Sequence, residues 1–186
     1  MSGRGRRPAP PGVSVDKDIE AMIRVDHAGE YGAVRIYQGQ LAVFDALSRT
    51  SKAADAIRSM AQAEQRHLKT FDRLVNERKV RPTALSPAWR MAGFALGAAT
   101  ALMGEKAAMA CTAAVEEVID EHYASQLDRL GGDAELKKTV EDFRGDEIAH
   151  RDEALAHGAE QAPAYRLLSE AIKSGCRLAI KLSERI

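Results

Sequence analysis

The stretch MAQAEQRHLKTF, residues 60–71, bears most directly on the fold. Met60 and Phe71 lie on one face of a predicted helix, and steps of four, three and four residues place Glu64 and His67 on the same face. That face is apolar and is expected to be buried. A carboxylate and an imidazole in such a place are costly unless they are paired or bind a cation. The stretch therefore predicts a helix that buries polar side chains for a chemical purpose.

Composition limits the classes of protein. With 186 residues, 45% of them hydrophobic, the chain is long enough for one sizeable core. Acidic and basic residues balance at 27 each, so we expect no nucleic-acid partner. Cys111 and Cys176 lack the spacing of a redox or zinc motif and fit a reduced compartment. The basic, Pro/Gly-rich residues 1–13 predict a disordered tail, and residues 14–186 predict a single domain.

Helical patterns cover the rest of the chain, and alternating strand patterns are absent. The predicted fold class is therefore all-α. We predict five helices, and Asp133 is expected to cap the fourth. They run over residues 14–47, over 51–79, from Ala88 through a bend at Gly104 to the Gly131–Gly132 turn, from Asp133 to His157, and from Pro163 almost to the C-terminus.

Each of the first four helices carries one glutamate on its apolar face, and two of them add a histidine three residues later. These residues are Glu30, Glu64, His67, Glu116, Glu147 and His150. The first two glutamates are equally far from a break near Leu47, and the last two are equally far from the Gly131–Gly132 turn. Antiparallel hairpins would therefore bring each pair to one height.

Four buried carboxylates cannot all stay ionised without a counter-charge. Two divalent ions would balance them, and a glutamate from each of four helices with two Glu-x-x-His pairs matches the di-iron or di-manganese pattern of ferritin-like bundles. Oxygen-rich ligands favour iron or manganese over a structural zinc site. The sequence therefore predicts a ferritin-like four-helix bundle with a di-iron centre.

Five segments carry a closer resemblance. They are RVDHAGEYGAVRIYQGQLAVF, AEQRHLKTF, RPTALSPAWRMAGFALGAATALMGEKAAMACTAAVEE, DEIAH and APAYRLLSEAIKSGCRLAIKLSERI. The chain resembles the demethoxyubiquinone hydroxylases of ubiquinone biosynthesis over nearly everything after the tail. The central RPT and GFALG motifs and the terminal LSER motif are specific to that family among ferritin-like proteins. Carried over by motif, the family's metal ligands fall on the six residues named above. The loop between the third and fourth helices looks shorter than in animal members.

The resemblance implies a reaction and its partners. The reaction is hydroxylation of the ring of a long-tailed demethoxyubiquinol with O2, using two iron ions and electrons ultimately from NADH. No GxGxxG motif follows a predicted strand, so NADH would not bind in a Rossmann fold. The resemblance also implies a helical lipid-binding accessory protein in some organisms. The expected location is the membrane surface, on the cytoplasmic face in a bacterium or the matrix face of the mitochondrial inner membrane for a eukaryotic mature form.

Residues near the predicted ligands carry open interpretations. Tyr123, two turns after Glu116, is expected to guide a proton, to touch the quinone, or to be an ordinary core tyrosine. His27 is expected either behind the metal ligands or in packing and capping. Three aspartates are candidates to orient metal-bound histidines, namely Asp26, Asp120 and Asp146. Two histidines are expected at the surface or at the core edge, namely His122 and His157.

An apolar segment, Met91–Gly104, is too short to span a bilayer, because 14 helical residues cover about 21 Å of an apolar thickness of about 30 Å. A buried core helix and interfacial insertion both stay open, and Gly93-x-x-x-Gly97 is a weak signal of close helix packing. Counted from the predicted ligands, this apolar extension of the third helix should overhang by about 16 Å. The C-terminal amphipathic helix would lie at the same end. Its basic residues, which suit a membrane interface, are Arg166, Lys173, Arg177 and Lys181.

Three other functions compete with a membrane-bound di-iron monooxygenase. A ferritin-like iron-binding protein or ferroxidase would use similar ligands without needing an apolar extension. A manganese catalase would turn over peroxide without an organic substrate. A non-catalytic helical scaffold would keep its function after loss of all six ligands.

Overall fold

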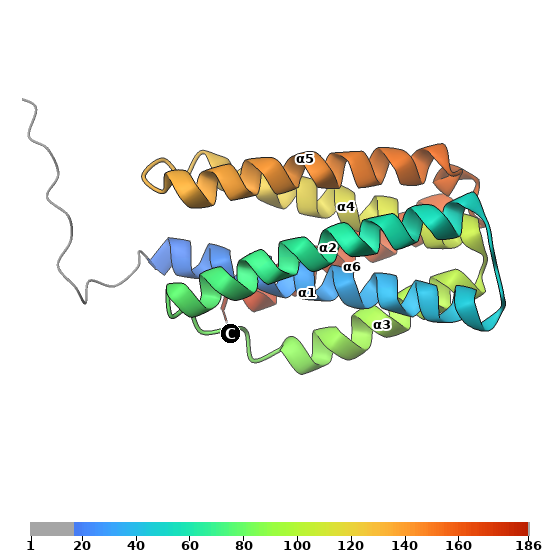
Figure 1. Cartoon of the computed structure of the whole chain (residues 1–186), viewed down its shortest axis with the longest axis horizontal. Helices are drawn as coiled ribbons and strands as arrows, with labels where there is room; N and C mark the ends of the chain where they lie inside the picture. Colours follow the sequence, from blue (N-terminus) through green and yellow to red (C-terminus); the bar gives the residue numbers. More distant parts are fainter. Residues whose placement is uncertain (1–16, 186) are drawn as a thin grey trace, which may run out of the picture.

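The computed structural model describes residues 17–185, which form α-helices and one short 3-10 helix with no strand among them (Figure 1). The elements are α1 (Lys17–Ala46), α2 (Lys52–Glu77), α3 (Ser86–Leu102), α4 (Glu105–Leu127), α5 (Ala134–Ala156), η1 (Ala159–Gln161) and α6 (Tyr165–Ser183). The all-α prediction is confirmed. The tail predicted over residues 1–13 lies outside the described residues.

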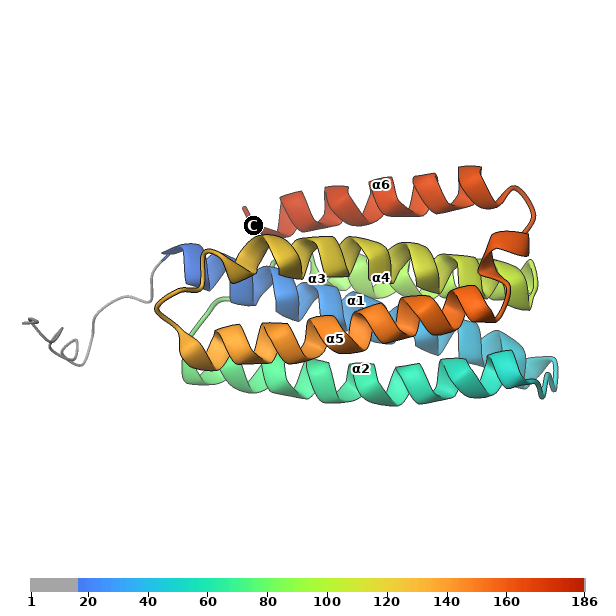
Figure 2. The same ribbon diagram turned by 90° about the horizontal axis from the view of Figure 1, so that it is seen from above.

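Helices α1, α2, α4 and α5 form a four-helix bundle (Figure 2). The turns between α1 and α2 and between α4 and α5 reverse the chain, so each pair is an antiparallel hairpin. Ser51 caps α2 by accepting from the amide of Ala54, and Asp133 caps α5 by accepting from the amide of Leu136, as predicted for Asp133. His157 is half-buried just after α5.

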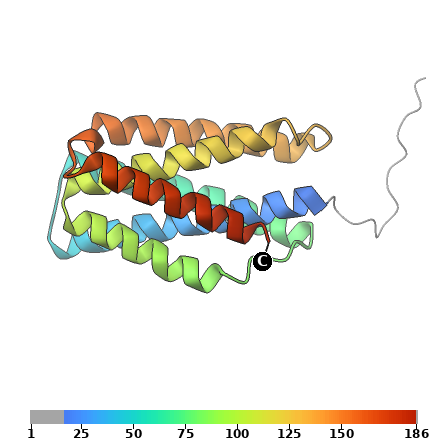
Figure 3. The same cartoon turned by 180° about the vertical axis from the view of Figure 1, so that it is seen from behind.

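The predicted third helix is in fact two helices. The chain reverses between Leu102 and Glu105, where Gly104 has a φ of 117°, a conformation that favours glycine. The apolar segment therefore forms α3, a separate helix that runs back along the bundle before α4 begins (Figure 3). The predicted overhang of about 16 Å is wrong, because it assumed that this segment and α4 were one continuous helix.

Helix α3 packs very closely against α1. A Cβ atom added to Gly97 would lie 1.9 Å from the backbone oxygen of Ile36, and one added to Gly39 would lie 2.2 Å from that of Phe94. Gly93 faces α1 in the same way, with its nearest contact at 3.0 Å. The glycines thus allow the two backbones to touch, as the close-packing interpretation of this motif predicted.

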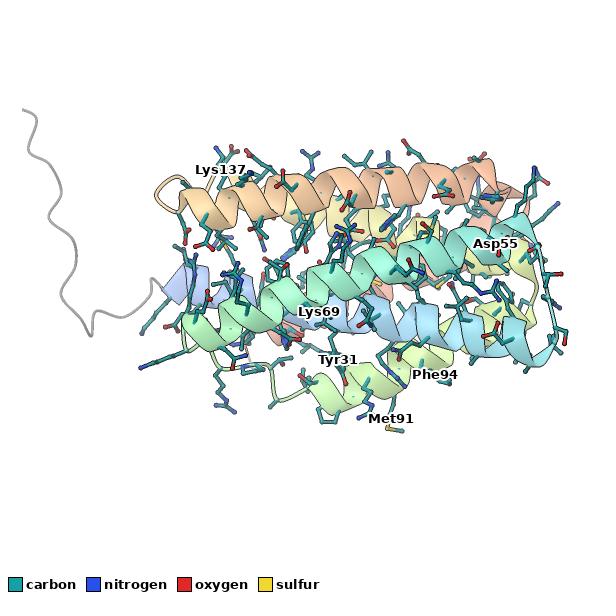
Figure 4. The ribbon with its side chains drawn as sticks, in the orientation of Figure 1. Tyr31, Asp55, Lys69, Met91, Phe94 and Lys137 are labelled. Carbon is teal, nitrogen blue, oxygen red and sulfur yellow. The ribbon has the colours of Figure 1, made fainter. Side chains whose placement is uncertain are left out.

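The opposite face of α3 carries exposed apolar side chains. Met91 is 75% exposed, points away from the bundle in Figure 4, and is followed by the exposed Leu102 and Met103. Phe94 is half-buried and packs under the guanidinium of Arg35. The segment is therefore not a fully buried core helix. None of the helices in residues 17–185 combines the length and the apolar character needed to cross a membrane.

Helix α6 lies along α4 (Figures 2 and 3). Lys173 and Arg177, which were expected to face a membrane, instead form ion pairs with Glu117 and Glu121 of α4 at 2.7 and 3.0 Å. Carboxylates one helix away therefore partner these two charges, and a membrane contact of this helix stays a prediction. The outer face of α6 still carries the 74%-exposed Leu167 and the exposed Leu178.

Two apolar clusters of the core lie on either side of a polar layer, and a third cluster, which includes Ile36 and Ile172, packs between α1, α4 and α6. Of the first two, one contains Phe44 and Ile57, and the other contains Phe71 and Leu136. Along each of the four bundle helices, the predicted metal ligands lie between residues of the first cluster and residues of the second. Apolar side chains therefore close the polar layer at both ends.

Candidate metal centre

The six predicted ligands meet in the polar layer of the bundle. Five are at most 1% exposed, and His150 is 8% exposed. They form two groups whose ligand atoms lie within 4.8 Å of one another. One group is Glu30, Glu64, His67 and Glu147, and the other is Glu64, Glu116, Glu147 and His150. Two of the glutamates belong to both groups, so the arrangement is a pair of adjacent half-sites.

Each histidine approaches the glutamate of the other Glu-x-x-His pair. His67 Nδ1 lies 3.1 Å from Glu147 Oε1, and His150 Nδ1 lies 3.2 Å from Glu64 Oε1. His67 Nδ1 is also 3.5 Å from Glu30 Oε2. Packing of the two hairpins brings α2 and α5 to the same height at this point, and their facing residues interleave. Each half-site therefore depends on both hairpins.

The inward atoms of these residues lack the hydrogen bonds that buried polar atoms normally have. Among the six predicted ligands, the buried atoms without a hydrogen-bond partner in the described structure are Glu30 Oε2, Glu64 Oε1 and Oε2, His67 Nδ1, Glu116 Oε2, Glu147 Oε1 and Oε2, and His150 Nδ1. All of them face one small region, and together they form an oxygen-rich set with two nitrogens. This donor set fits two divalent iron or manganese ions, with Glu64 and Glu147 shared between them.

Charge in the metal-free centre is relieved by protons. Burial, and then repulsion from Glu147, raise the pKa values of Glu64 and Glu116 well above 4.5, and burial also raises the pKa of Glu147. Burial alone would lower the pKa of His67, but the nearby carboxylates of Glu147 and Glu30, at 3.1 and 3.5 Å from Nδ1, raise it to about 10. A cation would replace these protons, so metal binding and proton release are linked.

One of the three candidate aspartates contacts a histidine of the centre. Asp146 Oδ2 lies 3.0 Å from His67 Nε2 and orients the ring so that Nδ1 faces the half-sites. Asp120 instead accepts a hydrogen bond of 2.6 Å from Arg144 and contacts neither histidine of the centre in the described structure. Sequence alone did not distinguish these aspartates, because the choice depends on contacts between helices.

Asp26 and His27 likewise contact residues other than the six predicted ligands. Asp26 is buried and lies 3.1 Å from His122 Nε2 and 2.7 Å from Gln126 Nε2, which places His122 at the core edge as one of its two interpretations expected. His27 Nε2 lies 2.9 Å from Asp72 of α2, in a packing contact away from the six residues.

Two tyrosine hydroxyls donate hydrogen bonds to glutamates of the centre. Tyr123 Oη forms a short hydrogen bond with Glu30 Oε1, which makes it more than an ordinary core tyrosine. Tyr37 Oη donates to Glu116 Oε1 at 2.6 Å, and this contact was missed. A signal was present, because Tyr37 follows Glu30 by the same spacing with which Tyr123 follows Glu116.

A cavity of about 590 Å³ reaches one side of the centre. Helices α1, α3, α4 and α6 line it, mostly with apolar side chains such as Ile36, Leu96 and Ile172. Glu30 and Tyr123 are in its wall, whereas the other five predicted ligands are not. The half-site that contains Glu30 is therefore the one beside the cavity.

Comparison with known proteins agrees with this geometry. The family described as "Ubiquinone biosynthesis protein COQ7" matches residues 17–183. The chain is 59% identical over 169 residues to "3-demethoxyubiquinol 3-hydroxylase" of Rhodospirillum rubrum, covering 90% of this chain and 78% of the relative. Relatives named "NADPH-dependent 3-demethoxyubiquinone 3-hydroxylase, mitochondrial" are 51% identical in Dictyostelium discoideum and 50% in Homo sapiens, covering 90% of this chain and 77% and 78% of the relatives. The chain belongs to the ubiquinone biosynthesis protein COQ7 family of hydroxylases.

Proposed function

We propose that this oxidoreductase is a di-iron 3-demethoxyubiquinol 3-hydroxylase that uses O2 to hydroxylate the ring of a long-tailed substrate at a membrane surface. The observation that carries the proposal is the junction of an apolar cavity with a buried carboxylate and histidine centre at Glu30 and Tyr123. A cavity of this size is within the range that holds small organic ligands.

The residues of the chain would hold the metals and keep water away from them. Glu30 and His67 belong to the half-site beside the cavity, Glu116 and His150 belong to the other, and two shared glutamates join them. When bound, two iron ions would supply the activation of O2. Apolar clusters on either side of the polar layer restrict water, which limits side reactions of the oxidant.

Tyr123 is placed to contact the substrate ring. Its ring is in the cavity wall, and its hydroxyl donates to Glu30. Burial, and then the charge of Glu30, raise the pKa of Tyr123 well above 10, so the hydroxyl keeps its proton as a donor. A quinol ring in the cavity would therefore meet a neutral phenol beside the carboxylate of Glu30.

The exposed apolar residues of α3 and α6 support membrane binding. Both helices line the cavity, and both carry large apolar side chains on their outer faces, including Met91 and Leu178. A membrane contact there would let an isoprenoid tail stay in lipid while the ring enters the cavity. The corresponding location is the cytoplasmic face of a bacterial membrane or the matrix face of the mitochondrial inner membrane.

The electron donor is to be found by comparing NADPH with NADH. The resemblance led us to expect NADH, whereas the names of the Dictyostelium and human relatives specify NADPH. NADPH is therefore the first donor to test, with NADH beside it. Dependence on a helical lipid-binding accessory protein stays a prediction.

The decisive experiment follows the oxygen atom. Iron-loaded protein with reductant and demethoxyubiquinol, prepared without air, is exposed to oxygen-18 gas, and the quinone is analysed by mass spectrometry. We expect one labelled atom in the ring. Iron oxidation without labelled product would favour the ferroxidase alternative and contradict the proposal. Glu147→Gln should lose the labelled product, and Glu141→Gln is its matched control, because Glu141 is exposed on the same helix as Glu147 and should keep the activity.

A further inference from the structure

The two tyrosines that contact the centre form a repeated pattern. Tyr37 Oη donates to Glu116 Oε1, and Tyr123 Oη donates to Glu30 Oε1. Each tyrosine follows the glutamate of its own helix by about two helical turns and donates to the glutamate of the other helix. The two hydrogen bonds therefore cross between α1 and α4 as a matched pair.

Each of these bonds leaves one carboxylate oxygen free. Glu30 and Glu116 accept a tyrosine hydroxyl at Oε1, whereas Oε2 of each has no hydrogen-bond partner within the described residues. Both side chains are almost completely buried. A carboxylate with one oxygen held and the other unsatisfied offers a single oriented oxygen to a cation.

The two tyrosines differ in their access to the cavity. Tyr123 and Glu30 are in the cavity wall, and neither Tyr37 nor Glu116 is. Tyr37 is 1% exposed and packs in an apolar cluster, with its hydroxyl 3.7 Å from the sulfur of Met60. Tyr37 is therefore separated from both the substrate cavity and solvent, and its polar contact is directed to the centre.

We propose that Tyr37 is a positioning residue for the half-site that contains Glu116 and His150. Its hydroxyl holds Oε1 of Glu116 and leaves Oε2 for a divalent cation. Tyr123 has the matching role for Glu30 in the half-site beside the cavity. This inference rests on the metal centre of the proposed function, and it adds that each half-site is tuned by a tyrosine from the opposite helix.

Cobalt(II) tests the proposal without enzymatic turnover. Chelator-treated wild-type, Tyr37→Phe and Tyr123→Phe proteins are titrated with Co²⁺ without air, and binding is followed by visible absorption and by metal analysis. Loss of such an outer hydrogen bond typically lowers metal affinity about 10- to 100-fold. We expect Tyr37→Phe to lower the affinity for one of the two Co²⁺ ions by this factor, and Tyr123→Phe to lower the affinity for the other. Tyr31→Phe is the matched control, because Tyr31 is on α1 but faces the Met91 side of α3 (Figure 4).

A double-mutant cycle shows whether Tyr37 acts through its carboxylate. In a Glu116→Gln background, Tyr37→Phe should cause much less than its single-variant loss in affinity, because the group that it positions is already altered. Circular dichroism of each variant checks that the helices are intact. A full additional loss in that background would contradict the proposal.

The remaining outcomes are separable. Fewer than two Co²⁺ ions per wild-type chain would overturn the metal centre and this inference together. Two ions in the wild type with unchanged binding by Tyr37→Phe, or with both ions weakened equally, would overturn the inference alone. A ferric phenolate absorption band that Tyr37→Phe removes would also overturn it, because Tyr37 would then be a ligand.

Discussion

Gly97→Ala tests the close contact between α1 and α3 that forms part of the cavity wall. The added Cβ would lie 1.9 Å from the backbone oxygen of Ile36, and ordinary contact begins near 3.4 Å, so the helices must separate locally by about 1.5 Å. Overpacking costs about 1–3 kcal/mol, and a clash with backbone favours the upper end because no side chain can rotate away. The better helix propensity of alanine returns about 1 kcal/mol. The expected net loss is about 2 kcal/mol.

The assay is thermal unfolding followed by circular dichroism at one fixed metal content. For a domain of this size, a loss of about 2 kcal/mol lowers Tm by about 4–8 °C. Gly145→Ala is the control, because Gly145 is exposed in the middle of α5 and an added Cβ there has no neighbour within 4 Å. That variant should be as stable as the wild type or slightly more stable. If Gly97→Ala matches Gly145→Ala, the helices are not in the contact described and the reasoning is refuted.

Three further predictions concern the centre and the membrane face. Glu147→Gln with His150→Ala should remove at least one metal and abolish hydroxylation, as measured by elemental analysis and product formation, and wild-type turnover would contradict the assignment. In the metal-free protein, the folded-state pKa values of Glu64, Glu116, Glu147 and His67 exceed their unfolded values. Tm should therefore fall as pH rises from about 5 toward 10, and divalent metal should reduce this slope. A Tm that does not change with pH would exclude this linkage. Met91→Asp with Leu178→Asp should lower liposome co-sedimentation while Co²⁺ binding is retained, and unchanged sedimentation would place the membrane contact elsewhere.

Much of the fold and most of the site follow from local patterns. The period of 3.6 residues placed Glu64 and His67 on the apolar face of one helix, and equal distances from each of two turns placed each pair of glutamates at one height within its hairpin. These inferences need only helix geometry and the positions of the breaks. Sequence reasoning therefore found the six residues that the structure brings together before any helix was placed beside another.

Which helices are neighbours was decided by tertiary structure. An apolar segment that ends at Gly104 is compatible with a bend or with a full reversal, and the packing of Gly97 against α1 accompanies the reversal. The same packing places α3 beside the cavity. Local propensity cannot distinguish these outcomes, because both satisfy the same helical pattern.

The finer parts of the site depend on distances between helices. Glu147 is shared between half-sites, Asp146 rather than Asp120 contacts His67, and Tyr37 donates to Glu116, all through contacts between residues far apart in the chain. Residue types and spacing by themselves determined which groups would be buried together. Only the packed bundle decided which atoms meet, because side-chain rotamers and crossing helices set distances that no periodicity contains.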